Sequence, residues 1–528
     1  MKKYAPIVLI LILGVILRFY NNTLISLWHD EAFSGLMIRY PWNEMFYRLG
    51  LDVHPPMYYI FLRFWHYIFG DSLLSLRGFS IFFGTGTILA GYLFVKEAFK
   101  NEKAALWAAV FIAINPFQLQ YVNEARMYTF GAFFALMAAY FLVKALVLQK
   151  ALYESRIQNM PNLPENISNG KKMVWCYIGF VLSMIIIIYT HYYLFFTAAA
   201  LGLYGLLYLY FHHQGNWKKY LWLLASFIVI VLSFLPWLKT FLFQYRQVQA
   251  GYWISKINVW SIPATFWDML IGFERDTNKQ STQIMLILVL LFSLFMLYRF
   301  LRKTESFAKW LTVLAVLAPF GGALLFAILA KLKGSGSSVY LDRYFLFGSI
   351  FYSVALAVWL KEIKIKWLSV SLFLVYCALN FTAYVHYWSE LDVKSKPGMS
   401  AAAKFLEANV EQKHHVFVGT AFEFYNYKYY GTILNPIPSA PLLYTGGRAK
   451  ADQLSHVEGV SLLTDADLVP DFTAAVNKED IVWLVWTYAF GSNKPETPVN
   501  WVKIDEKEYP DVRPYPGTMI YVTEYKVN

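Results

Sequence analysis

Long apolar runs separated by short polar segments make up the chain from residue 4 to residue 386. A helix needs about 20 mainly apolar residues to cross the ~30 Å hydrocarbon core of a bilayer. Candidate runs of this kind lie near 4–20, 73–95, 104–121, 127–148, 173–190, 192–211, 219–241, 283–300, 309–330, 344–361 and 367–386. The pattern therefore predicts a polytopic α-helical membrane protein with about eleven transmembrane helices.

Basic residues are concentrated in every second segment between these runs. If Lys2 and Lys3 are cytoplasmic, the other cytoplasmic segments are 95–103, 149–172, 212–219, 299–309 and 361–366, nearly all rich in Lys or Arg. Cytoplasmic loops carry such an excess of positive charge. We therefore expect a cytoplasmic N-terminus and, with an odd number of spans, an extracytoplasmic C-terminus. The first run has no small-residue cleavage site after it, so we interpret it as an uncleaved span.

Composition supports the membrane assignment. Apolar residues make up 58% of the 528-residue chain and charged residues 15%, against roughly 45–50% and about 25% in soluble globular proteins. The net charge of +12 is explained by the basic loops, so no nucleic-acid partner is expected. Cys176 and Cys377 both lie in apolar runs, which indicates neither a disulfide framework nor a zinc site.

Two regions outside the predicted spans also contain predicted helices or strands. In the first outer loop, 21–72, aromatic-rich stretches at 41–51 and 55–70 predict interfacial helices lying along the outer leaflet. After the last span, charge density becomes ordinary, with a predicted helix at 398–410 and predicted strands at 414–420, 480–486 and 518–525. We therefore expect a transmembrane domain, 1–387, and a C-terminal extracytoplasmic α/β domain, 388–528.

Two polar clusters in the first outer loop are candidates for chemistry. Asp30 and Glu31 in WHDEA are adjacent acids directly beyond the first span. They either solvate the loop or include a general base that takes a proton from a nucleophile. In DVHPPMYY, Asp52 and His54 stand before two prolines, which stiffen the turn. His54 is either a hinge between two interfacial helices or a site residue.

Two further clusters reach the outer face on this topology. YVNEARMYTF contains Glu124, Arg126 and Tyr128, and YLDRYFLFG contains Arg343 and Tyr344. Arg126 either pairs only with Glu124 or faces an anionic lipid headgroup, and Arg343 either extends to phospholipid headgroups or has a role in the site. Arginine suits a phosphate because of its planar fork of donors. Acids for proton transfer and arginines for a phosphate would suit an enzyme whose donor is a lipid phosphate.

These motifs, in this order, resemble those of a known enzyme family. WHDEA, DVHPPMYYIFLRFWHYIFGDSLLSLRGFS and NPFQLQYVNEARMYTF resemble the N-terminal core of the GT-C glycosyltransferases over about residues 5–150. The branch they are most similar to contains the protein O-mannosyltransferases and the lipid A aminoarabinose transferase. The resemblance implies a GT-C-like fold and sugar transfer from a polyprenyl-phosphate carrier on the extracytoplasmic side, usually with inversion.

The resemblance also implies roles for individual residues. It makes Asp30 the candidate general base, with Glu31 as its catalytic neighbour, and His54, Arg126 and Arg343 candidates for the carrier phosphate. Asp52, Glu124, Tyr128 and Tyr344 are further site candidates. No metal ligand is indicated, and whether a divalent metal (Mg²⁺ or Mn²⁺) is a cofactor stays open.

The expected partners are the lipid-linked sugar, membrane lipids, and an acceptor that is a protein, a lipid or a glycan. The alternative from another class is a multispan transporter or flippase. Transporters usually place ionisable residues near the bilayer midplane and often contain internal repeats. Neither feature is evident here, because the polar clusters are concentrated outside the spans.

Overall fold

The computed structural model describes residues 4–157, 164–212, 217–250, 254, 257–272, 279–332, 338–455, 458–513 and 517–528. Lys2 and Lys3, and parts of the basic segments 149–172 and 212–219, lie outside these ranges. The chain forms two compact units. The first contains Met1–Phe19, Ser80–Asn123 and Met127–Val385, and the second contains Tyr20–Phe79, Glu124–Arg126 and His386–Asn528.

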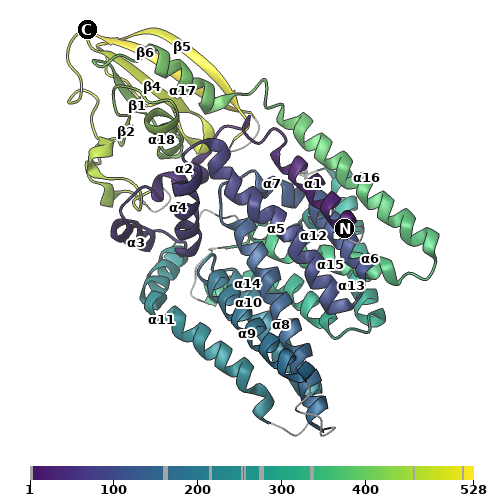
Figure 1. The fold of residues 1–528 in the computed structure, drawn as a ribbon. Coiled ribbons are helices and arrows are strands. Elements are labelled where there is room, and N and C mark those ends of the chain that lie inside the picture. The colour runs from purple at the N-terminus through teal and green to yellow at the C-terminus, as the bar shows by residue number, and fades with distance from the viewer. Residues whose placement is uncertain are drawn as a thin grey trace. The chain divides into compact units, whose positions relative to one another are not determined.

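The first unit is helical (Figure 1). Its helices, two of which continue into segments of the second unit, are α1 (Ala5–Phe19), α5 (Leu73–Phe99), α6 (Glu102–Ile114), α7 (Pro116–Val122), α8 (Tyr128–Ile157), α9 (Pro164–Ile188), α10 (Leu194–His212), α11 (Leu221–Ala250), α12 (Ser261–Leu270), α13 (Gln280–Lys303), α14 (Ala308–Leu332), α15 (Leu346–Glu362) and α16 (Lys366–Leu391), with short 3₁₀ turns at Trp217–Tyr220 and Asp342–Phe345. Within the described ranges, nine helices are long and apolar enough to cross a membrane, or ten if a bent pair is one span. These numbers bear out a polytopic helical membrane protein.

Two of the eleven predicted spans differ in the structure. The first run forms only the 15-residue helix α1, shorter than a comfortable span. The third run is broken into α6 and α7, which are bent by 54°. Asn115 causes the break: it has extended backbone angles, and its side chain accepts a hydrogen bond from Gln118 N–H. Pro116 follows at the first helical position, where its missing N–H costs nothing.

The first outer loop is helical in the second unit. Helices are present at both predicted stretches, as α3 (Trp42–Leu51) and α4 (Met57–Phe69). A third helix, α2 (His29–Met37), covers the segment that the apolar pattern leaves as loop. Asp30 and Glu31 occupy its first turn, where negative charge is favoured by the helix dipole.

The remainder of the second unit is built on a mixed six-stranded sheet in the order β3-β2-β1-β4-β6-β5. Neighbours from β3 to β4 are parallel, and the β4–β6 and β6–β5 pairs are antiparallel. The strands are β1 (His415–Val418), β2 (Leu442–Tyr444), β3 (Leu468–Val469), β4 (Ile481–Thr487), β5 (Trp501–Asp511) and β6 (Thr518–Val527). Helices α17 (Gly398–Asn409) and α18 (Ala421–Tyr429) and a π-helical turn, Tyr430–Leu434, accompany it.

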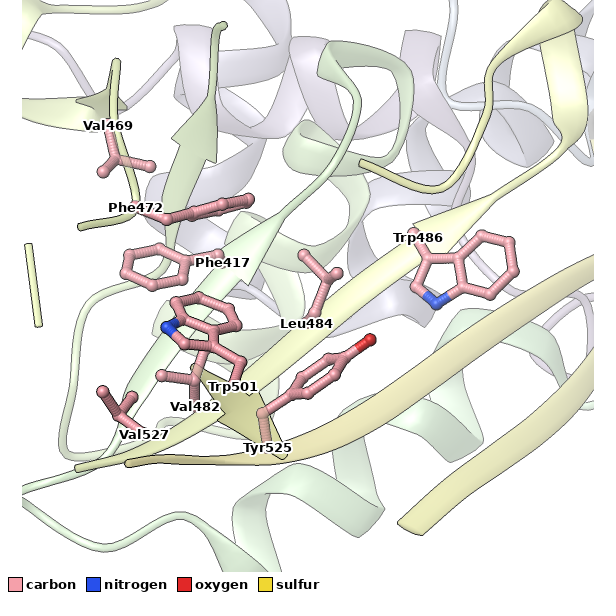
Figure 2. Close-up of a cluster of buried hydrophobic side chains, with 9 residues drawn as sticks. All are labelled: Phe417, Val469, Phe472, Val482, Leu484, Trp486, Trp501, Tyr525 and Val527. Atoms are coloured by element: carbon pink, nitrogen blue, oxygen red, sulfur yellow. The ribbon is translucent and has the colours of Figure 1, made fainter. Parts of the chain in front are cut away.

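Buried side chains from five segments hold this sheet together. Figure 2 shows the cluster that they form, in which Phe417, Phe472, Trp501 and their neighbours pack on one another. The predicted helix at 398–410 and the three predicted strands are all present as α17, β1, β4 and β6. Strands β2, β3 and β5 and helix α18 are additional.

Candidate active site

The acid pair of WHDEA is divided by the helix on which it lies. Residues that are adjacent on an α-helix point about 100° apart, so Asp30 and Glu31 on α2 have different surroundings. The Asp30 side chain is 27% exposed, whereas that of Glu31 is fully buried. The two neighbouring carboxylates therefore differ in how accessible they are to a substrate.

Glu31 is bound on both oxygens. Arg77 Nε donates to Glu31 Oε1 and Nη2 donates to Oε2, each at 2.7 Å, and both side chains are 0% exposed. The backbone N–H of Ala125 also donates to Oε1, at 2.8 Å. Arg77 further donates to the carbonyls of residues 22, 25 and 26. Glu31 thus ties α2 to α5 and to the 124–126 segment.

Arg126 lies against Asp30 and is buried, with only 3% of its side chain exposed. Its Nη1 is within hydrogen-bond distance of Asp30 O (3.2 Å), Ser34 Oγ (3.3 Å) and Tyr59 Oη (3.4 Å). Its Nε is 4.0 Å from Asp30 Oδ2. A buried guanidinium beside a partly exposed carboxylate places a fixed positive charge next to a group that can accept a proton.

His54 connects Arg126 to Asp52. The His54 ring has Nδ1 2.9 Å from Asp52 Oδ2 and Nε2 3.4 Å from Arg126 Nη2. A guanidinium can only donate, so Nε2 accepts and Nδ1–H donates to Asp52. Burial alone would raise the pKa of Asp52, but the contact with His54, together with Arg126, holds it below its ordinary value. His54 also lies in the turn between α3 and α4, where a hinge was one of the two interpretations.

Glu124 pairs with an arginine from the distant C-terminal segment. Arg513 Nη1 is 3.0 Å from Glu124 Oε1, and the guanidinium carbon of Arg513 is 5.6 Å from the centroid of the Trp28 ring. Burial would lower the pKa of Arg513, but the Glu124 charge raises it above its ordinary value. Glu124 and Arg126 therefore each have a partner of their own, Arg513 and Asp30.

A second cluster belongs to the first unit. Arg343 Nη1 is 3.5 Å from the Tyr128 hydroxyl, and its guanidinium lies 6.0 Å from the centroid of that ring. Tyr344 packs on His191, with ring centroids 4.7 Å apart, and on Tyr193 at the same distance. Tyr128, Arg343 and Tyr344 thus lie in one cluster, which also contains His191.

Some site residues had little or no sequence signal. Ser34, Tyr59 and Arg77 contact the predicted residues but were not singled out as candidates, although Tyr59 and Arg77 stand in the quoted stretch DVHPPMYYIFLRFWHYIFGDSLLSLRGFS. Nothing in the sequence marks Arg513, which is 389 positions from its partner Glu124. Across the described ranges, no three His, Cys, Asp or Glu side chains are grouped in a way that could hold a metal ion.

Comparisons with known proteins give the class. Residues 53–154 match the model of the dolichyl-phosphate-mannose-protein mannosyltransferase family. This match supports the predicted membrane glycosyltransferase activity, and the transporter alternative has no support.

Solved structures show which fold the chain shares. It is similar to ArnT from Cupriavidus metallidurans bound to undecaprenyl phosphate, with a TM-score of 0.62, 12% identity and 98% of each chain covered. It is also similar to ArnT from the same organism in the apo state, with a TM-score of 0.61, 11% identity, and 99% of this chain and 98% of that chain covered. At this identity the likeness concerns the fold alone. No curated protein sequence matches the chain.

Proposed function

We propose that this protein transfers a sugar from a polyprenyl-phosphate carrier to an acceptor, on the extracytoplasmic side of the cell membrane and with inversion at the anomeric carbon. The family matched by residues 53–154 is named for a dolichyl-phosphate-linked sugar, and one structure with the same fold contains undecaprenyl phosphate. Both observations favour a donor in which the sugar is attached to a lipid phosphate.

The observation that carries the proposal is the environment of Asp30. Glu31 and Asp52 are bound to Arg77 and His54, and Glu124 to Arg513. Their side chains are 0%, 9% and 3% exposed, against 27% for Asp30. Asp30 is thus the acid of this cluster that is best placed to meet an acceptor.

Asp30 therefore acts as the general base. Its carboxylate takes the proton of the acceptor hydroxyl or amine as that atom attacks the anomeric carbon. The bond between the anomeric carbon and the phosphate oxygen breaks, and its electron pair leaves with the polyprenyl phosphate. No protonation of the leaving group is needed, but the negative charge that develops on it must be stabilised.

Arg126 is the group we assign to the carrier phosphate. It is buried beside Asp30, and the hydrogen bonds to Ser34, Tyr59 and His54 fix its orientation. A fixed donor costs no reorganisation when charge develops. His54 then acts on the phosphate through Arg126 rather than by direct contact.

The remaining predicted residues have supporting roles. Glu31 positions α2 through Arg77, which donates to both of its carboxylate oxygens. Arg343 stays a second candidate for the phosphate, with Tyr128 and Tyr344 beside it. The acceptor is a protein, a lipid or a glycan, and the N-terminus is cytoplasmic.

The test is sugar transfer by the purified full-length protein in nanodiscs, supplied with radiolabelled polyprenyl-phosphate sugars and extracted envelope acceptors. We expect Asp30→Asn to lower kcat by about 10²-fold or more, the usual consequence of losing a general base. Glu44→Gln is the matched control, because Glu44 is a half-exposed acid of the same unit that is paired with an arginine, Arg48.

Two outcomes would contradict the proposal. If Asp30→Asn turns over a donor as fast as the wild type does, Asp30 is not the base. If the wild type transfers no sugar from any lipid-phosphate donor but does use a soluble nucleotide sugar, the donor class is wrong.

A further inference from the structure

The residues directly before Asp30 are held from the C-terminal segment His386–Asn528. Helices α2 and α18 lie side by side in the second unit (Figure 1). Each of the four residues 26–29 contacts a different side chain of the C-terminal segment. These contacts differ in chemistry, and they occur in consecutive order along the chain.

The first contact is made by Ser26. Its hydroxyl is 2.7 Å from both carboxylate oxygens of Asp511, at the end of β5. Asp511 also accepts from the N–H of Met399 and the N–H of Arg513. A Cβ on Gly398 would lie 1.9 Å from Asp511 Oδ2, and Gly398 has a φ of +51°. The backbone at Gly398 therefore leaves room for the Asp511 carboxyl group next to the Ser26 hydroxyl.

The second and third contacts are made by Leu27 and Trp28. The buried backbone N–H of Leu27 donates to the hydroxyl of Tyr430 at 3.0 Å. The ring of Trp28 faces the Arg513 guanidinium, which is at the same time paired with Glu124. Arg513 thus touches both the WHDEA segment and the segment that ends in Arg126.

The fourth contact is made by His29. Its ring stacks on Tyr425 of α18, with centroids 4.7 Å apart and an angle of 27° between the rings. The next turn of α2 approaches α18 closely as well, because a Cβ on Gly35 would lie 2.4 Å from the Tyr429 ring. The start of α2 therefore rests directly on α18.

We propose that the C-terminal segment is a positioning element of the active site, in which Tyr430 and Arg513 fix residues 26–29 and so aim the Asp30 carboxylate. The inference rests on the proposed role of Asp30. A general base works only within hydrogen-bond reach of its proton, and a displacement of about 1 Å can cost roughly 10²-fold in rate. Tyr430 and Arg513 act through the backbone of residues 26–29 and touch no reacting atom.

Tyr430→Phe and Tyr427→Phe form a matched pair of variants. Both residues are buried tyrosines of the same helical stretch. The Tyr430 hydroxyl accepts from Leu27, whereas the Tyr427 hydroxyl has no hydrogen-bond partner among the described residues. Arg513→Met and Arg513→Lys add a second test, with Lys526→Met as its control, because Lys526 pairs with Glu479 at an exposed position.

The full-length protein is assayed in two ways. Sugar transfer gives kcat and the donor KM, and hydrogen exchange followed by mass spectrometry gives the protection of peptides that cover 26–36. We expect Tyr430→Phe to lower kcat about 10-fold with the donor KM unchanged, and to speed exchange of the Leu27 amide by about 10-fold or more. Arg513→Met lowers kcat by a similar factor, and Arg513→Lys recovers part of the loss.

The outcomes separate this inference from the proposed function. If Tyr427→Phe and Lys526→Met lower kcat as much as Tyr430→Phe and Arg513→Met do, the contacts provide general stability and the inference is wrong. Unchanged kcat in Tyr430→Phe and Arg513→Met also overturns it while leaving Asp30 as the base. Exchange of residues 26–36 can be measured even when no donor is turned over, and unchanged exchange in Tyr430→Phe would refute the inference by itself.

Discussion

Breaking the ion pair between Glu31 and Arg77 tests whether this pair holds α2 in the candidate site. Glu31→Gln keeps the shape of the side chain and an oxygen that can still accept from Ala125 N–H. It removes the negative charge that faces Arg77. Removing one partner of a buried ion pair typically costs about 3–5 kcal/mol, because the other charge is left uncompensated.

The structure sets where in this range the cost should fall. Arg77 also donates to the carbonyls of residues 22, 25 and 26, and these dipoles remain in the variant. We therefore expect a loss of about 3 kcal/mol, at the lower end. At about 1.4 kcal/mol per tenfold change in an equilibrium constant, opening of this region becomes roughly 150-fold more frequent.

Hydrogen exchange of peptides covering residues 22–36 measures this opening directly. Exchange of these amides in Glu31→Gln should be roughly 150-fold faster than in the wild type, by the same conversion, and kcat should fall with it. Glu479→Gln removes a carboxylate from an exposed pair and should leave the same peptides unchanged. If exchange in Glu31→Gln stays within about threefold of the wild type, the pair does not hold α2 and our account of the site is wrong.

Two further predictions concern single residues. Burial, with the neighbouring Asp511, raises the pKa of Glu423 to about 8; the folded state then holds a proton that the unfolded state releases above about pH 4.5. Stability should therefore fall as pH rises from about 4.5 to 8, and Glu423→Gln should remove this slope in chemical unfolding measured at each pH. Arg126→Lys keeps the charge but loses the planar fork, so the donor KM should rise about 10-fold or more, while Arg48→Lys should leave it unchanged. An equal KM in Arg126→Lys would exclude Arg126 from phosphate binding.

The spans and the C-terminal strands could be predicted because each depends on a local pattern. A long apolar run forms a helix in a membrane whatever surrounds it, and nine of the eleven runs do so at the required length. The exceptions are the 15-residue α1 and the broken run at Asn115. In the broken run, one capping side chain and one proline outweigh the hydropathy that a long window averages.

The candidate site was less predictable because its geometry depends on distant contacts. The sequence predicted that four polar clusters reach one outer face, and the structure shows contacts of Arg126 with Asp30 and with His54. The residue pattern could not predict that Glu31 is buried while Asp30 stays partly exposed, since that difference requires a helix where the pattern leaves a loop. Arg513 has no motif of its own, and only the folded chain shows that it reaches Glu124.

The order in which the site's parts are synthesised has a consequence for biogenesis. Asp30 is made early, whereas Tyr430 and Arg513, which we assign to its positioning, lie 400 and 483 residues later. At about 5–20 residues per second, the interval between Asp30 and Arg513 is roughly 25–100 s. During that time a nascent chain exposes its acid and its arginine without the contacts that aim them. On this proposal the chain has a built-in delay, which keeps its activity towards lipid-linked sugars low until Arg513 has left the ribosome.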